Sequence, residues 1–420
     1  MAILTIASIN IRWGKSTWQG TIDSDGKGYY CYLPAFLIYK DIHYGFLKEA
    51  ANPLITSQPD PEFRVESAGN IVNKYPAGEA VLILPFFLIA HLITILTGNV
   101  ADGYSYFYFI FVSIAALFYA WMGLYYTNKL LKGFNFSSGN IAISILVITF
   151  GTQLFLYIVS EPSMSHVFSF GLISGFFFYT FQYFKEMNFA HLFKVAILMG
   201  LIILVRPVNI FCLAFVPFLA TNWASLSAGS KHLLNQPKNL ILIFCTTISF
   251  AFIQLIIWKI QTGNFLIDTY TGEYFQWEKG KNLIPFLFSY KKGLLIYTPI
   301  LLMCFVGFIP LIQQNIYQAG SLMFALGITF FIFASWWCWW YGWSFSSRPV
   351  TEYMSVFAIL CSVFLTNLKS LISRRITIII LFGLIIFTQI QIFQYRHGFI
   401  DPENMTKEKY WDNFLRIDKL

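Results

Sequence analysis

Two acidic residues lie where a carboxylate could do chemistry. Asp25 lies in residues 21–30 (TIDSDGKGYY), and Glu161 follows an apolar run. A carboxylate at Asp25 could act as a general base that takes a proton from a hydroxyl group, and Glu161 could bind the molecule that carries this hydroxyl. A solvated turn is the alternative for Asp25, because Asp and Gly are common turn residues. Glu161 precedes Pro162, so a helix cap is its alternative.

Several cations could hold an anionic group near these acids. They are Lys74, Arg206, Lys291, Lys292 and Arg348. Lysine and arginine bind phosphate oxygens strongly at a dry site. Arg206 lies in an apolar region, where a charge is costly and usually faces a cavity. Lys291 and Lys292 are equally explained as anchors whose ammonium groups reach the membrane surface.

Three further candidates have structural alternatives of their own. Glu352 lies four residues after Arg348, so the two form an ion pair on one helix face or contact a ligand. His166, five residues after Glu161, is a ligand-binding or a hydrogen-bonded core residue. Tyr297 is a weaker candidate for a substrate contact.

No motif predicts a metal or a cofactor. Glu161 and His166 lack an identifiable third ligand, as a zinc site would require. The six cysteines are scattered without metal or disulfide spacing, which favours buried thiols. We therefore predict no metal and no cofactor.

The elements that position these residues must be membrane helices. Of the 420 residues, 57% are hydrophobic and only 11% charged, against about 25% charged in soluble domains. Several apolar runs are long enough to cross about 30 Å of hydrocarbon. The sequence predicts an all-α, polytopic transmembrane bundle of ten or eleven spans. The net charge of +8 is modest and dispersed, which excludes a nucleic-acid stripe.

The basic residues sort the connecting loops to two sides. The predicted apolar runs are residues 104–126, 141–159, 167–184, 195–204, 211–220, 240–258, 294–312, 322–340, 353–368 and 376–393. Alternate loops are rich in Lys and Arg, as cytoplasmic loops are. The other loops hold nearly all the candidate residues and are predicted to be external.

The assignment of the loops to the two sides of the membrane depends on how the start of the chain is interpreted. Residues 80–96 are apolar, but the loops on either side fall on the same side of the membrane, so we predict a juxtamembrane or re-entrant helix, with a full span as the alternative. Residues 1–11 are too short to span, and we expect them to be the end of a truncated first helix. We predict one integral membrane domain over residues 1–420, comprising that stub, an external loop with juxtamembrane helices (12–103), the bundle (104–393) and an external tail (394–420).

At this point the sequence resembles a known group of enzymes. Asp25 with Tyr29 matches the acid-x-x-x-Tyr pattern of the first external loop in GT-C glycosyltransferases, in the protein-mannosyltransferase-like (family 39) and aminoarabinose-transferase-like branch. Lys74 and Pro76 resemble the branch's Lys-Pro-Pro motif, with Tyr75 in place of the middle proline. Bacteroidota members of this group are similar in five further segments: residues 161–166 (EPSMSH), 204–209 (LVRPVN), 288–299 (FSYKKGLLIYTP), 336–343 (WWCWWYGW) and 405–411 (MTKEKYW).

The resemblance implies transfer of a sugar from a polyprenyl-phosphate donor, with inversion, at the periplasmic face of a bacterial inner membrane. Asp25 would be the base, with Glu161 as a second catalytic acid or acceptor contact. The predicted substrate-binding residues are Lys74, Tyr29, Arg206, His166, Lys291, Lys292, Tyr297, Arg348 and Glu352. The predicted partners are the donor lipid, a glycan, lipid or protein acceptor, and membrane lipids.

Two other functions remain open from the residues alone. A transporter or flippase of lipid-linked sugars would place polar residues at mid-membrane and often shows repeats. A polymerase or ligase of surface polysaccharide would be an external transferase with a diphosphate-linked donor. Residues 336–343 are most simply an interfacial aromatic belt, with sugar stacking as the alternative.

Overall fold

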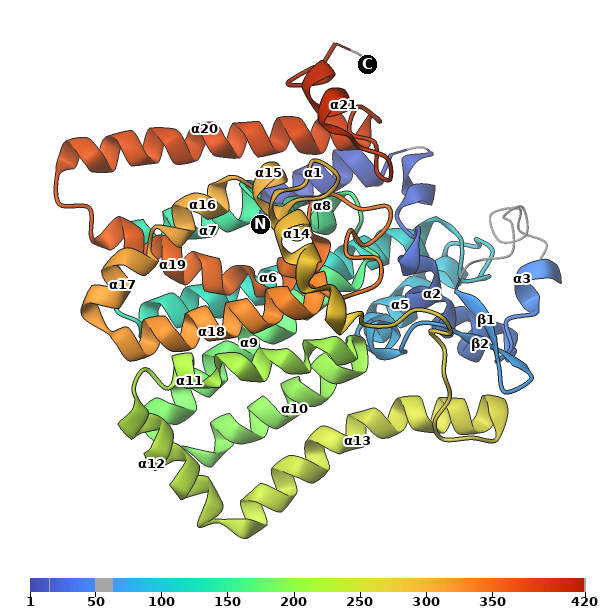
Figure 1. Ribbon diagram of the computed structural model, residues 1–420. Helices are drawn as coiled ribbons and strands as arrows, with labels where there is room; N and C mark the ends of the chain where they lie inside the picture. The colour runs from blue at the N-terminus through green and yellow to red at the C-terminus, as the bar shows by residue number, and fades with distance from the viewer. Residues whose placement is uncertain (15, 50–62, 419–420) are drawn as a thin grey trace.

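The computed structural model of the protein describes residues 1–14, 16–49 and 63–418 (Figure 1). Helices make up nearly all of its regular structure, which confirms the predicted all-α polytopic bundle. The sequence analysis did not predict a small antiparallel hairpin of β1 (Arg64–Ser67) and β2 (Asn70–Asn73), in which Val65 pairs with Val72.

Among the described residues, seven helices are long and apolar enough to cross a membrane. They are α5 (Gly78–Leu96), α6 (Tyr106–Gly133), α9 (Ser165–Glu186), α13 (Pro237–Thr262), α18 (Ile316–Ala334), η5 with α19 (Arg348–Tyr353 and Met354–Thr366) and α20 (Leu371–Arg396). An eighth arises if η3 (Pro207–Phe215) and α11 (Val216–Leu219) form one span with α12 (Trp223–Leu234), across a bend of 117°. Shorter apolar helices are α1 (Ala2–Arg12), α7 (Ser138–Phe150), α10 (Phe189–Val205) and the pair α16 and α17 (Ile300–Phe305 and Phe308–Gln314).

Two predicted spans are broken into pieces. The run 141–159 forms α7 and α8 (Leu154–Val159), and the run 294–312 forms α15 (Leu294–Tyr297), α16 and α17. Pro299 lies at the first break of the second run, where its ring removes a backbone donor and disfavours a helical residue before it.

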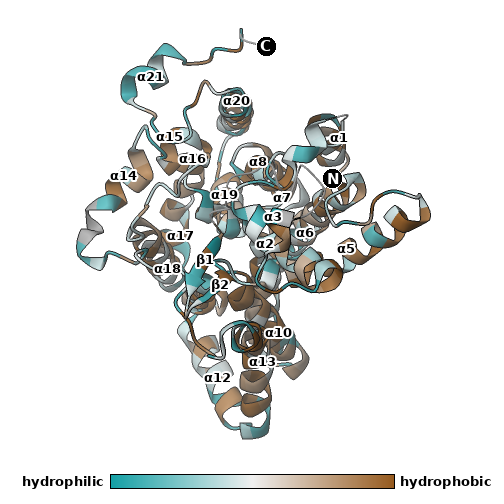
Figure 2. Ribbon diagram, turned by 90° about the vertical axis from the view of Figure 1, so that its right-hand side faces the viewer, coloured by the Kyte–Doolittle hydropathy of each residue, from teal (hydrophilic) through white to brown (hydrophobic). Residues whose placement is uncertain are grey.

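The helix α5 runs across the bundle although its length and hydropathy suit a span. Figure 2 shows α20 nearly end-on, whereas α5 is seen along its side. Its second half exposes an apolar stripe of Leu88, Ile89, Leu92, Ile95 and Leu96. A helix that lies across the spans and exposes apolar side chains fits the predicted juxtamembrane helix.

The core of the bundle is built around α9 and the η5–α19 helix. In the most apolar stretch of each helix, 78% of the residues are buried in α9 and 89% in η5–α19. The figure is 6% for α13, which lies at the periphery. The remaining elements gather at the two ends. α2 (Asp25–Pro34), its π-helical extension η2 (Ala35–Tyr39), α3 (Phe46–Glu49) and the hairpin lie at one end, on the right of Figure 1. The α11–α12 and α19–α20 connections lie at the other.

Three further short helices complete the description. They are η1 (Thr17–Gly20), η4 with α14 (Trp277–Asn282 and Leu283–Phe288), and α21 (Lys407–Asp412) in the C-terminal tail. The tail is tied to α20 because Gln391 donates to the Tyr410 hydroxyl at 2.8 Å. The division of the chain into a stub, loop, bundle and tail stays a prediction.

Candidate functional site

Asp25 is the first residue of α2, and its carboxylate is held by two side chains from distant parts of the chain. Arg348, at the start of η5, places Nη2 2.8 Å from Asp25 Oδ2. The Tyr75 hydroxyl donates to Asp25 Oδ1 at 2.8 Å. Burial raises the pKa of Asp25, but the Arg348 charge and the Tyr75 hydrogen bond outweigh burial, and the pKa lies below its ordinary value. Asp25 is therefore a carboxylate at neutral pH.

Close packing fixes the start of α2. A methyl group at Gly26 would lie 2.1 Å from Ser163 Oγ, and one at Gly28 would lie 2.5 Å from the Tyr75 ring. Ser163 Oγ also accepts a hydrogen bond from the Asp23 backbone at 3.3 Å. The segment is thus the start of a helix pressed against two other parts of the chain, and the solvated-turn interpretation is wrong.

Behind Asp25 lies a buried group around Glu352. His166 Nδ1 lies 2.8 Å from Glu352 Oε1, and both side chains are fully buried. Arg206, which follows the last residue of α10, places Nε 3.2 Å from the same oxygen. Arg206 Nη1 also donates to Ser165 Oγ at 3.3 Å. Arg206 therefore faces buried polar side chains, and its predicted place at a cavity stays a prediction.

Arg348 and Glu352 do not pair with each other, so the i,i+4 ion-pair interpretation is wrong. Arg348 pairs with Asp25, whereas Glu352 pairs with Arg206. The two residues lie on the 3-10 helix η5, where side chains four apart do not align as they do on an α-helix. As a result, η5 links the Asp25 group to the Glu352 group.

A second buried carboxyl, Glu79, lies in the first turn of α5. Its side chain is fully buried, and neither oxygen has a hydrogen-bond partner among the described residues. A methyl group at Gly78 would lie 2.3 Å from the Leu204 and Val205 backbone, so α5 meets the end of α10 directly. Arg206 and Asp25 are the charges that act on Glu79 electrostatically.

Lys74 lies just before α5 and forms an ion pair with Glu273. Its ammonium group lies 5.1 Å from the centre of the Tyr270 ring, within the range of a cation–π contact. The Tyr75 ring lies 6.3 Å from Tyr270 and 4.7 Å from Tyr29. Lys74 is therefore joined to the Asp25 group through a layer of tyrosines.

Glu161 follows α8 and belongs to a neighbouring polar group. Tyr395 of α20 hydrogen-bonds to it, and Arg12 donates to the adjacent Ser160 carbonyl at 2.6 Å. Burial raises the pKa of Glu161 above its ordinary value, despite the Tyr395 hydrogen bond and the charges of Arg348 and Arg12. Glu161 thus keeps its proton to higher pH than Asp25 does.

Lys292 completes this second group. Its side chain is almost fully buried, donates to the Ser344 carbonyl, and lies 5.8 Å from the centre of the Tyr395 ring. Burial lowers the pKa of Lys292 to about 7, although the Glu161 charge acts in the opposite direction. Lys292 therefore loses its positive charge as the pH rises through the physiological range.

Two predicted residues form no hydrogen bond or ion pair with these groups among the described contacts. The Lys291 ammonium lies 3.7 Å from the centre of the Trp340 ring, in the aromatic segment 336–343. Tyr297 donates its hydroxyl to the Tyr290 carbonyl and packs against Phe345 and Tyr410. Their roles in substrate binding stay predictions.

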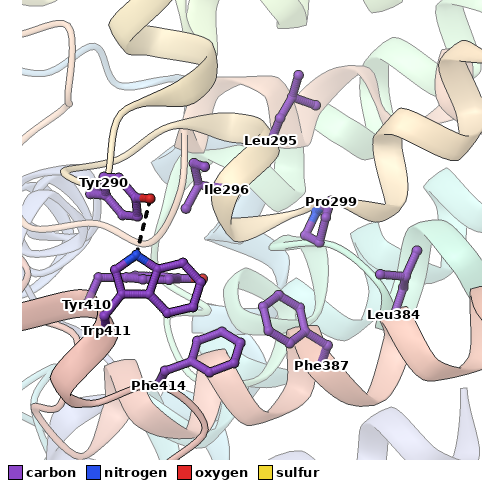
Figure 3. Close-up of a pocket in the computed structure, with 9 residues that line it drawn as sticks. All are labelled: Tyr290, Leu295, Ile296, Pro299, Leu384, Phe387, Tyr410, Trp411 and Phe414. Carbon is purple, nitrogen blue, oxygen red and sulfur yellow. Dashed lines mark hydrogen bonds between the residues drawn. The ribbon is translucent and has the colours of Figure 1, made fainter. Parts of the chain in front are cut away.

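An apolar pocket of about 340 Å³ lies beside Tyr290 (Figure 3). It is lined by Tyr290, Leu295, Ile296, Pro299, Leu384, Phe387, Tyr410, Trp411 and Phe414. The Trp411 indole donates to the Tyr290 hydroxyl at 3.3 Å, at the polar end of the pocket. Tyr297 joins this pocket to the second polar group, because Phe345 contacts both Tyr297 and Tyr395.

Among residues 1–14, 16–49 and 63–418, no group of three or more His, Cys, Asp or Glu side chains could hold a metal ion. The cations Arg206, Arg348 and Lys74 are the groups suited to an anion. The absence of a metal and a cofactor from the function stays a prediction.

Several polar residues of the site were not predicted from the sequence. Tyr75 was treated only as a departure from Lys-Pro-Pro, yet its hydroxyl binds Asp25. Glu79 was overlooked, although an acid at the start of a long apolar run is unusual and was the available signal. Arg12 and Tyr395 gave no signal, because each lies at the end of an apolar helix where charged and aromatic residues are common.

The structure is similar in fold to a solved protein structure. It matches ArnT from Cupriavidus metallidurans with a TM-score of 0.53 at 10% identity, over 95% of this chain and 63% of that one. The chain thus spans less than two thirds of the ArnT chain. This likeness confirms the fold that the GT-C resemblance implied.

An Archaeoglobus fulgidus oligosaccharyltransferase matches with a TM-score of 0.42 at 10% identity, over 99% of this chain and 54% of that one. No model of a known protein family matches the sequence. No curated protein matches it either.

Proposed function

We propose that the protein is a membrane glycosyltransferase that moves a sugar from a polyprenyl-phosphate donor to an acceptor, by direct displacement with inversion. The observation that carries the proposal is the ionised Asp25, held between Arg348 and Tyr75 at one end of the bundle. A base and cations for a phosphate lie together there, on a fold shared with ArnT, an aminoarabinose transferase.

In this reaction Asp25 takes the proton of the acceptor hydroxyl. The acceptor oxygen forms a bond to the anomeric carbon of the sugar, and the bond from that carbon to the phosphate oxygen breaks. The electron pair stays on the phosphate, which leaves with one more negative charge. Each oxygen of Asp25 has lone pairs left after accepting from Arg348 or Tyr75, so the acceptor hydroxyl has a place to bind.

The developing charge on the phosphate needs fixed cations. Arg206, Arg348 and Lys74 are the proposed donors, because hydrogen bonds between charged groups are strong in a site shielded from water. Each is already oriented by a carboxylate, namely Glu352, Asp25 and Glu273. Little reorganisation is then needed when charge builds up on the leaving phosphate.

The lipid tail of the donor needs an apolar surface that opens to the bilayer. The pocket beside Tyr290 suits such a chain because its walls are apolar. Ring contacts run from Tyr410 in its wall through Tyr297 and Phe345 to Tyr395, whose ring lies 5.8 Å from the Lys292 ammonium. Its volume of about 340 Å³ is near the lower end of the range for ligand pockets, about 300–1,000 Å³. We assign part of the polyprenyl chain to this pocket.

The charge pattern of the loops supports a site on the periplasmic face of a bacterial inner membrane. The acceptor is a glycan, a lipid or a protein with an accessible hydroxyl or amine. A flippase is the weaker alternative because the polar groups gather at one end of the bundle, whereas transport sites lie near the membrane midplane. A ligase with a diphosphate-linked donor differs in its donor.

The test uses the purified protein in proteoliposomes with a radiolabelled sugar on polyprenyl phosphate and, in parallel, on polyprenyl diphosphate. We expect transfer from the monophosphate donor to an extract of envelope acceptors, and no transfer by the Asp25→Asn variant. Movement of intact donor across the bilayer without transfer would establish the flippase. Use of the diphosphate donor alone would establish the ligase.

A further inference from the structure

Glu79 is a buried carboxyl that the proposed reaction leaves without a role. It is fully buried, and both oxygens lack a hydrogen-bond partner among the described residues. A buried charge without a partner is costly. If this position only needed to be filled, a glutamine or an apolar residue would fill it without the cost of burying a carboxyl group.

The packing keeps Glu79 near the site. The close contact of Gly78 with the Leu204 and Val205 backbone brings the first turn of α5 to the residue before Arg206. The Ala77 backbone also donates to Gln254 Oε1 at 2.8 Å, which ties the same turn to α13. The first turn of α5, which carries Glu79, is therefore held against the end of α10.

The charged and ionisable groups that act on Glu79 are Asp25 and Tyr29 on α2 and Arg206 after α10. The helices α13 and α6 contribute the uncharged Gln254 at Ala77 and the Tyr119 hydroxyl at Leu82. The Tyr119 hydroxyl donates a hydrogen bond to the Leu82 carbonyl at 3.4 Å. Arg206 is thus the one cation in this set.

Arg206 is also the ion-pair partner of Glu352 at 3.2 Å. A phosphate that binds Arg206 becomes a third anion around one guanidinium, beside Glu352 and Glu79. In a site shielded from water, repulsion between like charges is strong. The simplest relief is a proton on one of the carboxyls, and Glu79 is the carboxyl that no hydrogen bond holds in its charged form.

We propose that Glu79 takes up one proton when the phosphate of the lipid donor binds at Arg206, so that donor binding and protonation of this carboxyl are coupled. The inference rests on the proposed donor. Glu79 is a positioning residue in this scheme, because it acts on the phosphate through Arg206. Donor affinity then falls as the pH rises through the range in which Glu79 of the empty site loses its proton.

The test measures binding of a polyprenyl methyl phosphate to the purified full-length protein between pH 6 and 9. This phosphodiester stays a monoanion throughout, so its own titration does not contribute. For the wild type we expect the Kd to rise with pH, by up to about tenfold per unit as for one coupled proton. Glu79→Gln mimics the protonated carboxyl, and should bind as tightly as the wild type at pH 6 and lose this part of the slope.

Three controls separate the outcomes. Lys292 also loses charge in this range, so the Glu79 contribution is the difference in slope between the wild type and Glu79→Gln. Glu66→Gln, at an exposed position on β1, should keep the wild-type slope. Glu79→Met, a second neutral variant, should lose the slope as Glu79→Gln does.

Equal slopes in the wild type and both neutral variants would overturn the coupling while leaving the donor assignment intact. Failure of the wild type to bind the probe at any pH would instead overturn the proposed donor and, with it, this inference. A slope that disappears in the neutral Glu79 variants and persists in Glu66→Gln supports the coupling.

Discussion

Asp25 and Glu161 are two carboxyl groups at the same end of the protein with opposite environments. Asp25 begins a helix and is bound by Arg348 and Tyr75, so its pKa lies below the ordinary value. Glu161 lies in a connection between helices, where burial is the dominant influence and the pKa lies above the ordinary value. Arg348 acts on both, but its guanidinium forms an ion pair only with Asp25 among the described contacts.

The difference teaches how one site divides the roles of acid and base. When neighbouring environments push the pKa values of two carboxyls apart, the lower one suits a base and the higher one a proton donor or a neutral hydrogen-bond partner. We therefore assign the proton-accepting role to Asp25 alone. The four substitutions below test this division, beginning with the one expected to have the largest effect.

Asp25→Asn should reduce sugar transfer by about 100-fold or more, the range expected when a general base is lost. Asparagine keeps the shape of the side chain but cannot accept the proton. The measurement is the initial rate of transfer in proteoliposomes. Asp23→Asn is the matched control, because Asp23 is exposed and pairs with Lys27, and it should keep near-normal activity. Full activity of Asp25→Asn would remove Asp25 as the base.

Arg348→Gln should lower kcat/KM for the donor by about 10- to 100-fold, since one charged hydrogen bond contributes about 1.5–3 kcal/mol. It should also change the pH profile. A base with a lowered pKa is active above that pKa, and activity is lost as the pH falls through it. Removal of the Arg348 charge raises the pKa of Asp25, so the acidic limb should move to higher pH.

A rate loss without movement of the acidic limb would show that Arg348 binds the donor but does not set the state of Asp25. Arg64→Gln, on the hairpin, is a control cation and should leave the acidic limb in place.

Lys74→Ala should weaken donor use by about 3- to 10-fold. The effect is smaller because Lys74 and Glu273 are partly exposed, at 17% and 26%, and water screens partly exposed pairs. The loss should fall on the donor KM rather than on kcat. Lys40→Ala, an exposed lysine after η2, is the matched control. An unchanged donor KM would remove Lys74 from the donor site.

The sequence predicted the composition of this site better than its connections. Hydropathy predicted the helical bundle, because it depends on local composition. The assignment of α5 as a juxtamembrane or re-entrant helix, with a full span as the alternative, stays a prediction, since its length and hydropathy also suit a span. The pairing of Asp25 with Arg348, 323 positions apart, had no local signal. Spacing suggested that Arg348 would pair with Glu352, and it failed because η5 is a 3-10 helix.

Glu161→Gln should have the smallest effect, within about threefold of the wild-type rate at neutral pH, if its role is that of a neutral partner. Glutamine can still hydrogen-bond to Tyr395, and it removes a carboxyl that burial already disfavours in its charged form. The variant should also lower the pH at which the Lys292 cation is lost: any charge on Glu161 raises the pKa of Lys292, so without it that pKa falls and activity that needs the cation is lost at lower pH. The pH profile of transfer measures this shift of the alkaline limb, with Glu403→Gln as a control because Glu403 is a weaker influence on Lys292.

A rate loss as large as that of Asp25→Asn would instead make Glu161 a second essential acid, and the division of roles between the two carboxyls would be wrong.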